Sequence, residues 1–476
     1  MVVYLDHAAT TPMLPEARAA YVAALGIVGN PSSIHGAGQN AKRMLEEARE
    51  QVAASIGCDP IEVVFTSGGT ESVNLAIKGL FWARNALPGG RVGPADGGHV
   101  LRPHNRILVS RGEHHATIDT VEWLQQHEGA ILEWLPIDEL GCVRVAAVAE
   151  ALERYDDFAL LTVLWANNEV GTIQPVAELV ALATAHGVPV HADAVAAYTH
   201  VPIDFASSGL AALSVSAHKI GGPLGIGALV LSRAASVVPL IHGGGQQRQV
   251  RSGTQDAPAA IAFGVAAQQA ASPVAAAPPA TPHVMALRDR LIAGVQEAVP
   301  AAILRGDPVD RLANNAHFTF PGCEGDSLLY LLDAAGVSVS TGSACQAGIP
   351  EASHVLLGMG LSESEARGAL RFTLGHTSTE ADVDALLAAL PPAHKRALRA
   401  GLAARDPSRG AARPSAAPQR RAAPQRRAPP FVLNAGVSAT SGDAMPGFSG
   451  MPSLDSCISD SLRASSTDLT SRTLHM

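Results

Sequence analysis

Lys219 is the residue best placed for covalent chemistry. It follows a short apolar run that ends at Ser216, and it precedes Gly221-Gly222-Pro223. Most lysines are solvated surface charges, so a lysine at the end of an expected core strand calls for a functional explanation. Burial lowers the pKa of an amine and frees it to attack a carbonyl carbon, as a Schiff-base lysine must. Ser216 and His218 flank Lys219 with hydrogen-bond donors suited to a phosphate group.

The segment around Gly69 has the composition of an anion site. An apolar run ends at Thr66, Ser67-Gly68-Gly69 follows as a turn, and a helical pattern begins at Thr70. The first turn of a helix has free N–H groups and the positive end of the helix dipole, which together favour an anion. Gly69 permits close approach of the backbone, and the Thr70 hydroxyl adds a donor. An ordinary N-cap would explain the same residues if the motif stood alone.

Asp193 lies at the end of another apolar run, in Val190-His191-Ala192-Asp193. Burying a carboxylate is unfavourable unless a cation pairs with it. A protonated pyridine nitrogen is such a cation, and pyridoxal phosphate (PLP) needs that proton to act as an electron sink. An N-cap or a structural ion pair is the alternative explanation.

A scaffold must bring these strand ends together. Seven short apolar runs predict strands at 63–66, 107–110, 131–135, 160–164, 188–192, 213–216 and 228–231. Amphipathic segments between them, such as 39–56, 71–83 and 176–186, predict helices. This alternation indicates an α/β fold whose large domain has a mostly parallel seven-stranded sheet flanked by helices.

The domain organisation follows from changes in composition. We expect an N-terminal segment over 1–15 that packs with the small domain, a large cofactor-binding domain over 16–260 and a smaller α+β domain over 261–400. Residues 85–105 predict a surface loop, and 271–283 predict a linker or exposed turn. In the small domain we expect a strand near 316–320 and helices near 326–335 and 381–389.

Residues 401–476 predict a disordered low-complexity tail. They contain the near-repeat AAPQRR-AAPQRR and no Trp or Tyr, so they cannot bury enough apolar surface to offset the entropy of ordering. The tail carries nine Arg and five Asp, a charge of +4, and the whole chain carries −9, which leaves −13 for residues 1–400. Such an acidic body argues against nucleic-acid binding as the main function. We expect the tail to be a dispensable extension, although its arginines could contact an acidic partner.

The cysteines and the N-terminus place the chain in a reducing, aqueous compartment. The five cysteines share no CxxC spacing, so the sequence predicts neither a metal site nor a disulfide framework; they are Cys58, Cys142, Cys323, Cys345 and Cys457. The first residues lack the basic and apolar regions of a signal peptide. No apolar run reaches the roughly 18 residues that a membrane helix needs. We therefore expect a cytoplasmic protein.

Read together, the motifs resemble those of one enzyme family over about residues 3–390. The chain resembles the class V aminotransferase group of fold-type I PLP enzymes, and within it the NifS/IscS-type cysteine desulfurases. The matching segments are Tyr4-Leu5-Asp6-His7-Ala8-Ala9-Thr10-Thr11-Pro12, Gly29-Asn30-Pro31-Ser32-Ser33-Ile34-His35, Thr66-Ser67-Gly68-Gly69-Thr70-Glu71-Ser72, Glu113-His114-His115-Ala116, Asn167-Asn168-Glu169-Val170-Gly171, Ser216-Ala217-His218-Lys219, Gly243-Gly244-Gly245-Gln246, Arg251-Ser252-Gly253-Thr254, Thr341-Gly342-Ser343-Ala344-Cys345 and Arg371-Phe372.

The resemblance implies a role for each site residue. Lys219 would hold the cofactor and move the proton at the substrate Cα, and Asp193 would pair with the ring nitrogen. His114 would stack on the ring and assist proton transfer, and Asn168 would lie near the ring 3-oxygen and the substrate. The expected phosphate ligands are Gly69, Thr70, Ser216 and His218, with Thr254 reaching the partner's phosphate across a homodimer interface. Arg371 would bind the substrate carboxylate through its guanidinium fork.

Cys345 separates a desulfurase from a transaminase. It lies in a run of small residues, 340–348, that we expect to be mobile. The resemblance implies that its thiolate takes sulfur from L-cysteine as a persulfide, releases L-alanine and passes the sulfur to an acceptor, such as an iron–sulfur scaffold or another sulfur carrier.

Ala196 departs from the family pattern. The family has Asp-Ala-x-Gln where this chain has Asp193-Ala194-Val195-Ala196, so a glutamine hydrogen bond to the ring 3-oxygen would be missing. Such a bond contributes roughly 0.5–1.5 kcal/mol. Two alternatives stay open on the sequence. The chain could be a selenocysteine lyase or another class V PLP transferase, such as a transaminase, or it could be a degenerate, non-catalytic interaction protein.

Overall fold

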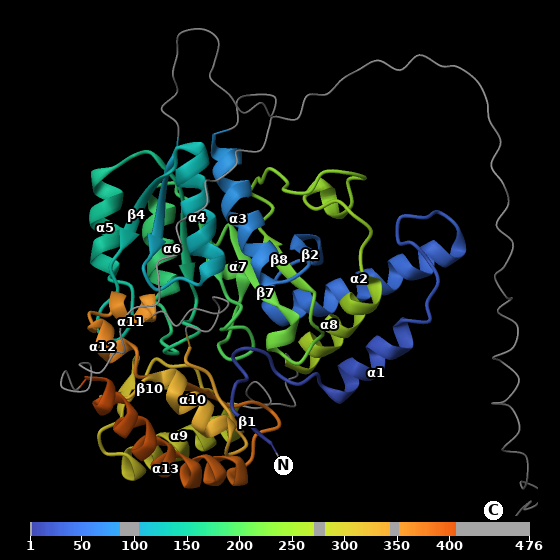
Figure 1. Ribbon diagram of the computed structural model, residues 1–476. Coiled ribbons are helices and arrows are strands. Elements are labelled where there is room, and N and C mark those ends of the chain that lie inside the picture. The colour runs from blue at the N-terminus through green and yellow to red at the C-terminus, as the bar shows by residue number, and fades with distance from the viewer. Residues whose placement is uncertain (1, 86–103, 271–280, 343–351, 406–476) are drawn as a thin grey trace, which may run out of the picture. The chain divides into compact units, whose positions relative to one another are not determined.

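The computed structural model describes residues 2–85, 104–270, 281–342 and 352–405 (Figure 1). The expected loop at 85–105 and the expected linker at 271–283 lie mainly outside these residues. Cys345 and the expected tail beyond residue 405 also lie outside them.

A seven-stranded sheet in the order β2-β8-β7-β6-β5-β3-β4 is the centre of the fold. Only β8 runs antiparallel to its neighbours in this sheet. The predicted mostly parallel sheet is confirmed, and each strand lies within two residues of its predicted position. The strands are β2 (Val63–Thr66), β3 (Arg106–Ser110), β4 (Ile131–Leu135), β5 (Phe158–Leu164), β6 (Val190–Asp193), β7 (Ala212–Ser216) and β8 (Gly227–Leu231).

Helices cover both faces of this sheet, as the alternating pattern predicts. On one face, α3 (Gly69–Arg84) and α4 (His115–Glu128) share a core with strand residues such as Val64 and Ile107. Phe65 and Leu108, the next residues in those strands, belong to the core on the other face, because successive strand residues point to opposite sides. The helices of that second face are α2 (Gly36–Ile56), α5 (Val145–Arg154), α6 (Val176–Ala185) and α8 (Ala257–Ala270), and α1 (Pro15–Ala24) packs on α8.

A smaller antiparallel sheet, β12-β10-β9, has a core of its own. Phe318 and Phe372 are fully buried against the helices of this part, which gather around the β10 label in the lower part of Figure 1. The alternate residues His317 and Arg371 are cross-strand partners and are also buried, so the opposite face of the sheet is polar. The strands are β9 (Ile303–Arg305), β10 (Asn315–Thr319) and β12 (Ala369–Thr373), and the helices are α9 (Thr281–Ala298), α10 (Gly325–Asp333) and α13 (Glu380–Arg405).

Helix α13 is longer than the sequence predicted. We expected a helix near 381–389, yet it continues through Pro391-Pro392 to Arg405, five residues into the expected tail. Leu390, Ala393 and Ala397 are all buried in the core of the small sheet. Their spacing keeps one apolar face on that core, and this packing outweighs the local preference of proline to end a helix.

The N-terminal segment contacts elements next to the small sheet and next to the large sheet. β1 (Val3–Tyr4) pairs in parallel with β11 (Val337–Ser338), and Asp6 forms a β-bridge with Thr373. Farther along, the Leu14 N–H donates to the Gly221 carbonyl at 2.9 Å, next to Lys219. The segment therefore crosses the region where the strand ends meet.

The described residues contain neither a membrane helix nor a metal cluster. No described helix is both long and apolar enough to span a bilayer. Within the same residues, no group of three or more His, Cys, Asp or Glu side chains is arranged to hold a metal ion.

The packing of α13 leads to a test of stability. Leu390→Ala should lower the free energy of unfolding by about 2–5 kcal/mol, because it leaves a cavity in the core of the small sheet. The exposed Lys395 on the same helix provides the control, and Lys395→Ala should change stability by less than about 0.5 kcal/mol. Urea unfolding of both variants measures the difference, and equal stabilities would show that α13 does not pack as described.

Candidate active site

The candidate site lies at the carboxyl ends of the central strands, where ligands bind in open α/β sheets. Asp193 ends β6, Ser216 ends β7, and Gly69 starts the helix that follows β2. His114 follows β3 and Asn168 follows β5. The parallel pairing of β5, β6 and β7 brings residues that are distant in the sequence to one edge.

Lys219 ends a short 3-10 helix, η2 (Ala217–Lys219), immediately after β7. Its Nζ donates to the backbone carbonyls of Ala8 and Ala9, the latter at 3.0 Å. The Thr11 N–H donates in turn to the His218 carbonyl at 3.1 Å. The N-terminal segment therefore holds the lysine in place.

The start of α3 and the end of β7 form a narrow cradle. A Cβ on Gly69 would lie 2.7 Å from Val195 Cγ2 and 3.6 Å from Ser216 Cβ, so any larger residue at this position would force Val195 to shift. The Ser216 hydroxyl is buried without a hydrogen-bond partner in the described part of the chain. Leaving such a group unpaired costs roughly 1–3 kcal/mol. An unpaired donor facing an open helix start fits a phosphate.

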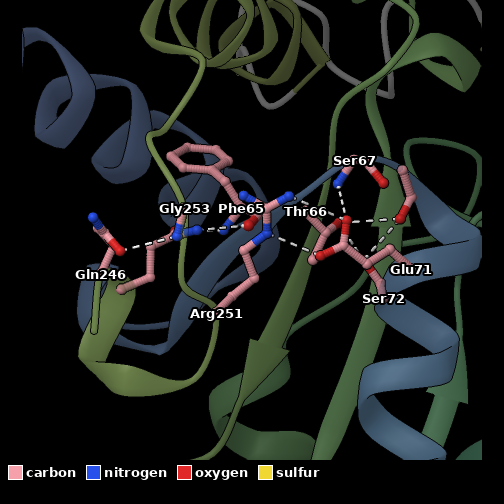
Figure 2. Close-up of polar contacts among 10 residues, drawn as sticks. Phe65, Thr66, Ser67, Glu71, Ser72, Gln246, Arg251 and Gly253 are labelled. Carbon is pink, nitrogen blue, oxygen red and sulfur yellow. Dashed lines mark hydrogen bonds and ion pairs between the residues drawn. The ribbon is translucent and has the colours of Figure 1, made fainter. Parts of the chain in front are cut away.

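The turn before α3 is held by polar contacts (Figure 2). The Glu71 carboxylate accepts the Ser67 N–H at 2.7 Å, and the hydroxyls of Thr66 and Ser72 lie 2.7 Å apart. Arg251 approaches Glu71 from a distant loop. These contacts fix the backbone whose N–H groups would face the anion.

Asp193 is the buried carboxylate of the site. It is 3% exposed, and its Oδ1 accepts the Val195 N–H at 2.9 Å. Burial raises the pKa of Asp193 to about 6, although the Val195 N–H and the charge of Lys219 oppose this effect. A cationic pyridine nitrogen would satisfy this carboxylate, so the residues present fit PLP at both its phosphate and its ring.

His114 is the N-cap residue of α4. Its Nδ1 accepts the Ala116 N–H at 3.0 Å, which fixes the ring orientation and leaves the proton of the neutral ring on Nε2. Burial, followed by the charge of Lys219, lowers the pKa of His114 to about 4. The preceding Glu113 is fully buried, and burial raises its pKa well above the ordinary value. The imidazole therefore stays neutral at physiological pH.

Arg371 and Asn168 meet beside this site. Asn167 forms an Asx turn, accepting the N–H groups of Glu169 and Val170, and this turn presents Asn168. Arg371 Nη1 donates to the Asn168 carbonyl at 2.8 Å, and Nη2 contacts Asp6 Oδ1 at 2.9 Å. Arg371 Nε is buried and has no partner among the described residues. The guanidinium is thus held in one orientation, and its Nε donor is left unsatisfied.

The remaining predicted residues differ in setting. Burial lowers the pKa of His218 to about 4, and His218 Nδ1 lies 3.3 Å from the Thr10 hydroxyl. Thr70 and Thr254 are exposed. Ala196 lines a small cavity together with Lys219, Asn168 and other residues, which places the expected missing hydrogen bond beside the lysine.

Sequence reasoning missed four contributors. They are Asp6, which orients Arg371; Glu113, which precedes His114 and accepts the Leu164 N–H of β5; the Glu71–Arg251 pair; and His317, which is fully buried beside Arg371 with both ring nitrogens unpaired in the described structure. Asp6, Glu71 and Glu113 each lie in one of the segments that match the family, and a charged residue in such a segment was a signal that could have identified them. His317 had no local signal.

A family model described as Aminotransferase class-V matches residues 3–386. A curated relative from Mycobacterium tuberculosis (strain ATCC 25618 / H37Rv), named IscS-like cysteine desulfurase, is 52% identical over 85% of this chain and 100% of its own length. The cysteine desulfurase IscS of Methanosarcina thermophila is 39% identical over 82% of this chain and 91% of its own.

Solved structures agree with this match. A NifS-like protein superposes with a TM-score of 0.73 at 31% identity, covering 83% of this chain and 99% of that one. A structure titled SspA in complex with cysteine has a TM-score of 0.65 at 30% identity, covering 78% of this chain and 98% of its own.

The raised pKa of Asp193 leads to a test in cofactor-free protein. The pKa of an Asp in an unfolded chain is about 3.9. Between this pH and about pH 6, Asp193 therefore binds more protons in the folded protein than in the unfolded chain. The contribution of the Asp193 carboxyl to folding stability is therefore fully present below this pH range and is lost as the pH rises through it. Asp193→Asn should therefore be more stable than the wild type at pH 8, by up to about 3 kcal/mol, and closely similar at pH 4.

Urea unfolding of both cofactor-free proteins across this range measures the effect. Histidines such as His114 and His191 titrate in the same range, but both proteins share them, so only the difference between the two curves counts. A difference that does not vary with pH would contradict the assignment.

Proposed function

This chain belongs to the class-V aminotransferase family, and from that premise we propose that it is a PLP-dependent cysteine desulfurase that converts L-cysteine to L-alanine. The observation that carries the proposal is the buried Asp193 carboxylate beside Lys219, with the unpaired Ser216 hydroxyl at the neighbouring strand end. The match to relatives named cysteine desulfurase, which covers more than 80% of this chain, supports the same reaction and favours an enzyme over a non-catalytic interaction protein.

The cofactor-binding residues divide into a phosphate set and a ring set. Gly69, Thr70, Ser216 and His218 would hold the phosphate, and Asp193 would keep the ring nitrogen protonated. PLP, when bound, supplies an electron sink for negative charge at the substrate Cα. Lys219 would hold the cofactor and afterwards carry the proton to and from Cα, because a lysine amine can bind a carbonyl carbon covalently and, once released, act as a base.

The neutral His114 suits a proton donor and stacking partner. Its Nε2 carries the proton, since Nδ1 is occupied as an acceptor from Ala116. A ring with a pKa of about 4 does not compete for charge with the protonated pyridine that Asp193 requires.

Arg371 would bind the substrate carboxylate, with Asn168 beside it. The unpaired Nε gives the carboxylate a charged donor, and Asp6 keeps the guanidinium from rotating away. This arrangement favours substrates with a free α-carboxylate.

Cys345 would be the nucleophile. Its thiolate attacks the substrate Sγ, the Cβ–Sγ bond breaks, and Cβ retains the bonding electrons and gains a proton, which leaves alanine and a Cys345 persulfide. Burial raises the thiol pKa of Cys58 to about 12 and those of Cys142 and Cys323 to about 11. At neutral pH these three thiols are therefore protonated, which makes them poor nucleophiles.

A homodimer and a sulfur acceptor complete the proposal. Large apolar side chains are exposed in one stretch, with Val28 at 85% and Ile34 at 91%, as expected of a surface that another subunit covers. The exposed Thr254 would then reach the partner's phosphate. We further propose a cytoplasmic location and an acceptor such as an iron–sulfur scaffold or another sulfur carrier.

The nucleophile is tested by substitution. Cys345→Ser should lower sulfide release from L-cysteine, in the presence of a thiol reductant, by at least about 10³-fold, and leave the visible absorbance of bound PLP unchanged. Cys142→Ser is the matched control and should retain full activity. Undiminished sulfide release by Cys345→Ser would refute the desulfurase proposal.

Ala196 offers a gain-of-affinity test. Ala196→Gln should tighten PLP binding by about 2- to 10-fold, the equivalent of one added hydrogen bond to the ring 3-oxygen. Titration of cofactor-free protein measures the dissociation constant. An unchanged or weakened affinity would show that the neighbouring residues already satisfy this oxygen or fill its place.

A further inference from the structure

The segment that leads to Thr254 has an unusual backbone. Three consecutive non-glycine residues, Gln247, Arg248 and Gln249, have φ values of 48°, 61° and 62°. A left-handed backbone is unfavourable for a non-glycine residue and persists only where the surroundings impose it. Contacts with the rest of the structure must therefore hold this turn in place, and a turn that is held in this way can position the residues that follow it.

The first restraint is Gln247 on the edge of the large sheet. Its Nε2 donates to the Phe65 carbonyl at 2.7 Å, and its Oε1 accepts the Phe65 N–H at 2.8 Å. Arg49 Nη1 donates to the same Oε1 at 3.2 Å. β2 is an edge strand, so the side chain of Gln247 occupies the backbone groups that a neighbouring strand would otherwise use.

The second restraint is the ion pair between Arg251 and Glu71 (Figure 2). Arg251 Nε lies 2.9 Å from Glu71 Oε1, and Nη2 lies 3.5 Å from Oε2. The two side chains are only 20% and 13% exposed. Burial acts to raise the pKa of Glu71, but hydrogen bonds from Arg251 and Ser67 hold it below its ordinary value. The pair is therefore ionised and shielded from most of the solvent.

The Arg251–Glu71 ion pair joins the expected phosphate-binding turn to the loop that carries Thr254. Glu71 directly follows Thr70 in the first turn of α3 and also accepts the Ser67 N–H, so it is part of the turn that would hold the phosphate. Arg251 lies three residues before the exposed Thr254. Gln246 Oε1 additionally accepts the Gly253 N–H at 2.9 Å, which closes the loop next to Thr254 (Figure 2).

We propose that Arg251 is a positioning residue that serves two cofactor sites at once: through Glu71 it orders the phosphate turn of its own subunit, and through the strained loop it presents Thr254 to the phosphate of the partner subunit. This inference rests on the proposed homodimer and on the proposed role of Thr254. It links the two phosphate sites through one ion pair, so cofactor affinity in one subunit depends on a side chain of the other.

Mixed dimers isolate this effect. One subunit is wild type, and the other carries Lys219→Ala, so that only the wild-type subunit gives the visible absorbance of lysine-bound PLP. Adding Arg251→Gln to the Lys219→Ala subunit should raise the PLP dissociation constant of the wild-type subunit by about 5- to 150-fold, a typical range for coupling between sites. A purely local structural role of Arg251 would leave that constant unchanged, and this result would overturn the proposal.

Two controls complete the experiment. Arg248→Gln removes an exposed positive charge from the same loop, and in the Lys219→Ala subunit it should leave the dissociation constant unchanged. Arg251→Lys retains one charged contact to Glu71 and should give an intermediate constant, which also covers the case in which Arg251→Gln fails to fold. An effect of Arg248→Gln equal to that of Arg251→Gln would attribute the loss to net charge and contradict the proposal.

The outcomes separate this inference from the function on which it rests. A wild-type protein that binds PLP and releases sulfide, but whose mixed dimers show no effect of Arg251→Gln, retains its function and loses this inference. A wild-type protein that never acquires the visible absorbance loses the proposed function itself.

Discussion

The site is organised around a carboxylate that the protein cannot leave unpaired. Asp193 is buried at the end of a central strand, where one backbone N–H and the charge of Lys219 only partly offset the loss of solvation. A protonated ring nitrogen would compensate the remaining loss of solvation of the carboxylate. The other features of the site are compatible with a cationic ring beside Asp193. His114 is neutral and does not compete for the positive charge, the start of α3 can hold an anion, and the N-terminal segment keeps Lys219 in place.

The sheet was predictable because most of its strands are buried on both faces. The sequence of a strand such as β5, which is buried along its whole length, is almost entirely apolar, and its bounds were predicted within two residues. The residues at the carboxyl ends of these strands, Asp193 and Ser216 among them, could therefore be placed at one edge from the sequence alone. The same local logic failed for α13, whose buried apolar face carries the helix past two prolines.

The contacts that align the site were beyond sequence reasoning, because they join residues that are distant in the chain. Asp6 and Arg371 are separated by 365 positions, and Glu71 and Arg251 by 180. No periodicity or spacing reports such a pair; only the folded chain brings the two partners together. The polar face of the small sheet has the same origin: Arg371 and His317 are neighbours through the register of β10 and β12. The structure thus adds the orientation of each group to a set of groups that the sequence had largely supplied.

The most direct test of the central claim follows the sulfur atom itself. Holoenzyme is treated with one equivalent of sulfur-labelled L-cysteine in the absence of reductant, the thiols are alkylated, and the peptides are mapped by mass spectrometry alongside the alanine produced. We predict alanine in equal amount to labelled sulfur, with the label on the Cys345 peptide. Alanine formed without protein-bound label, or label on another cysteine such as Cys142, would contradict a desulfurase that works through Cys345.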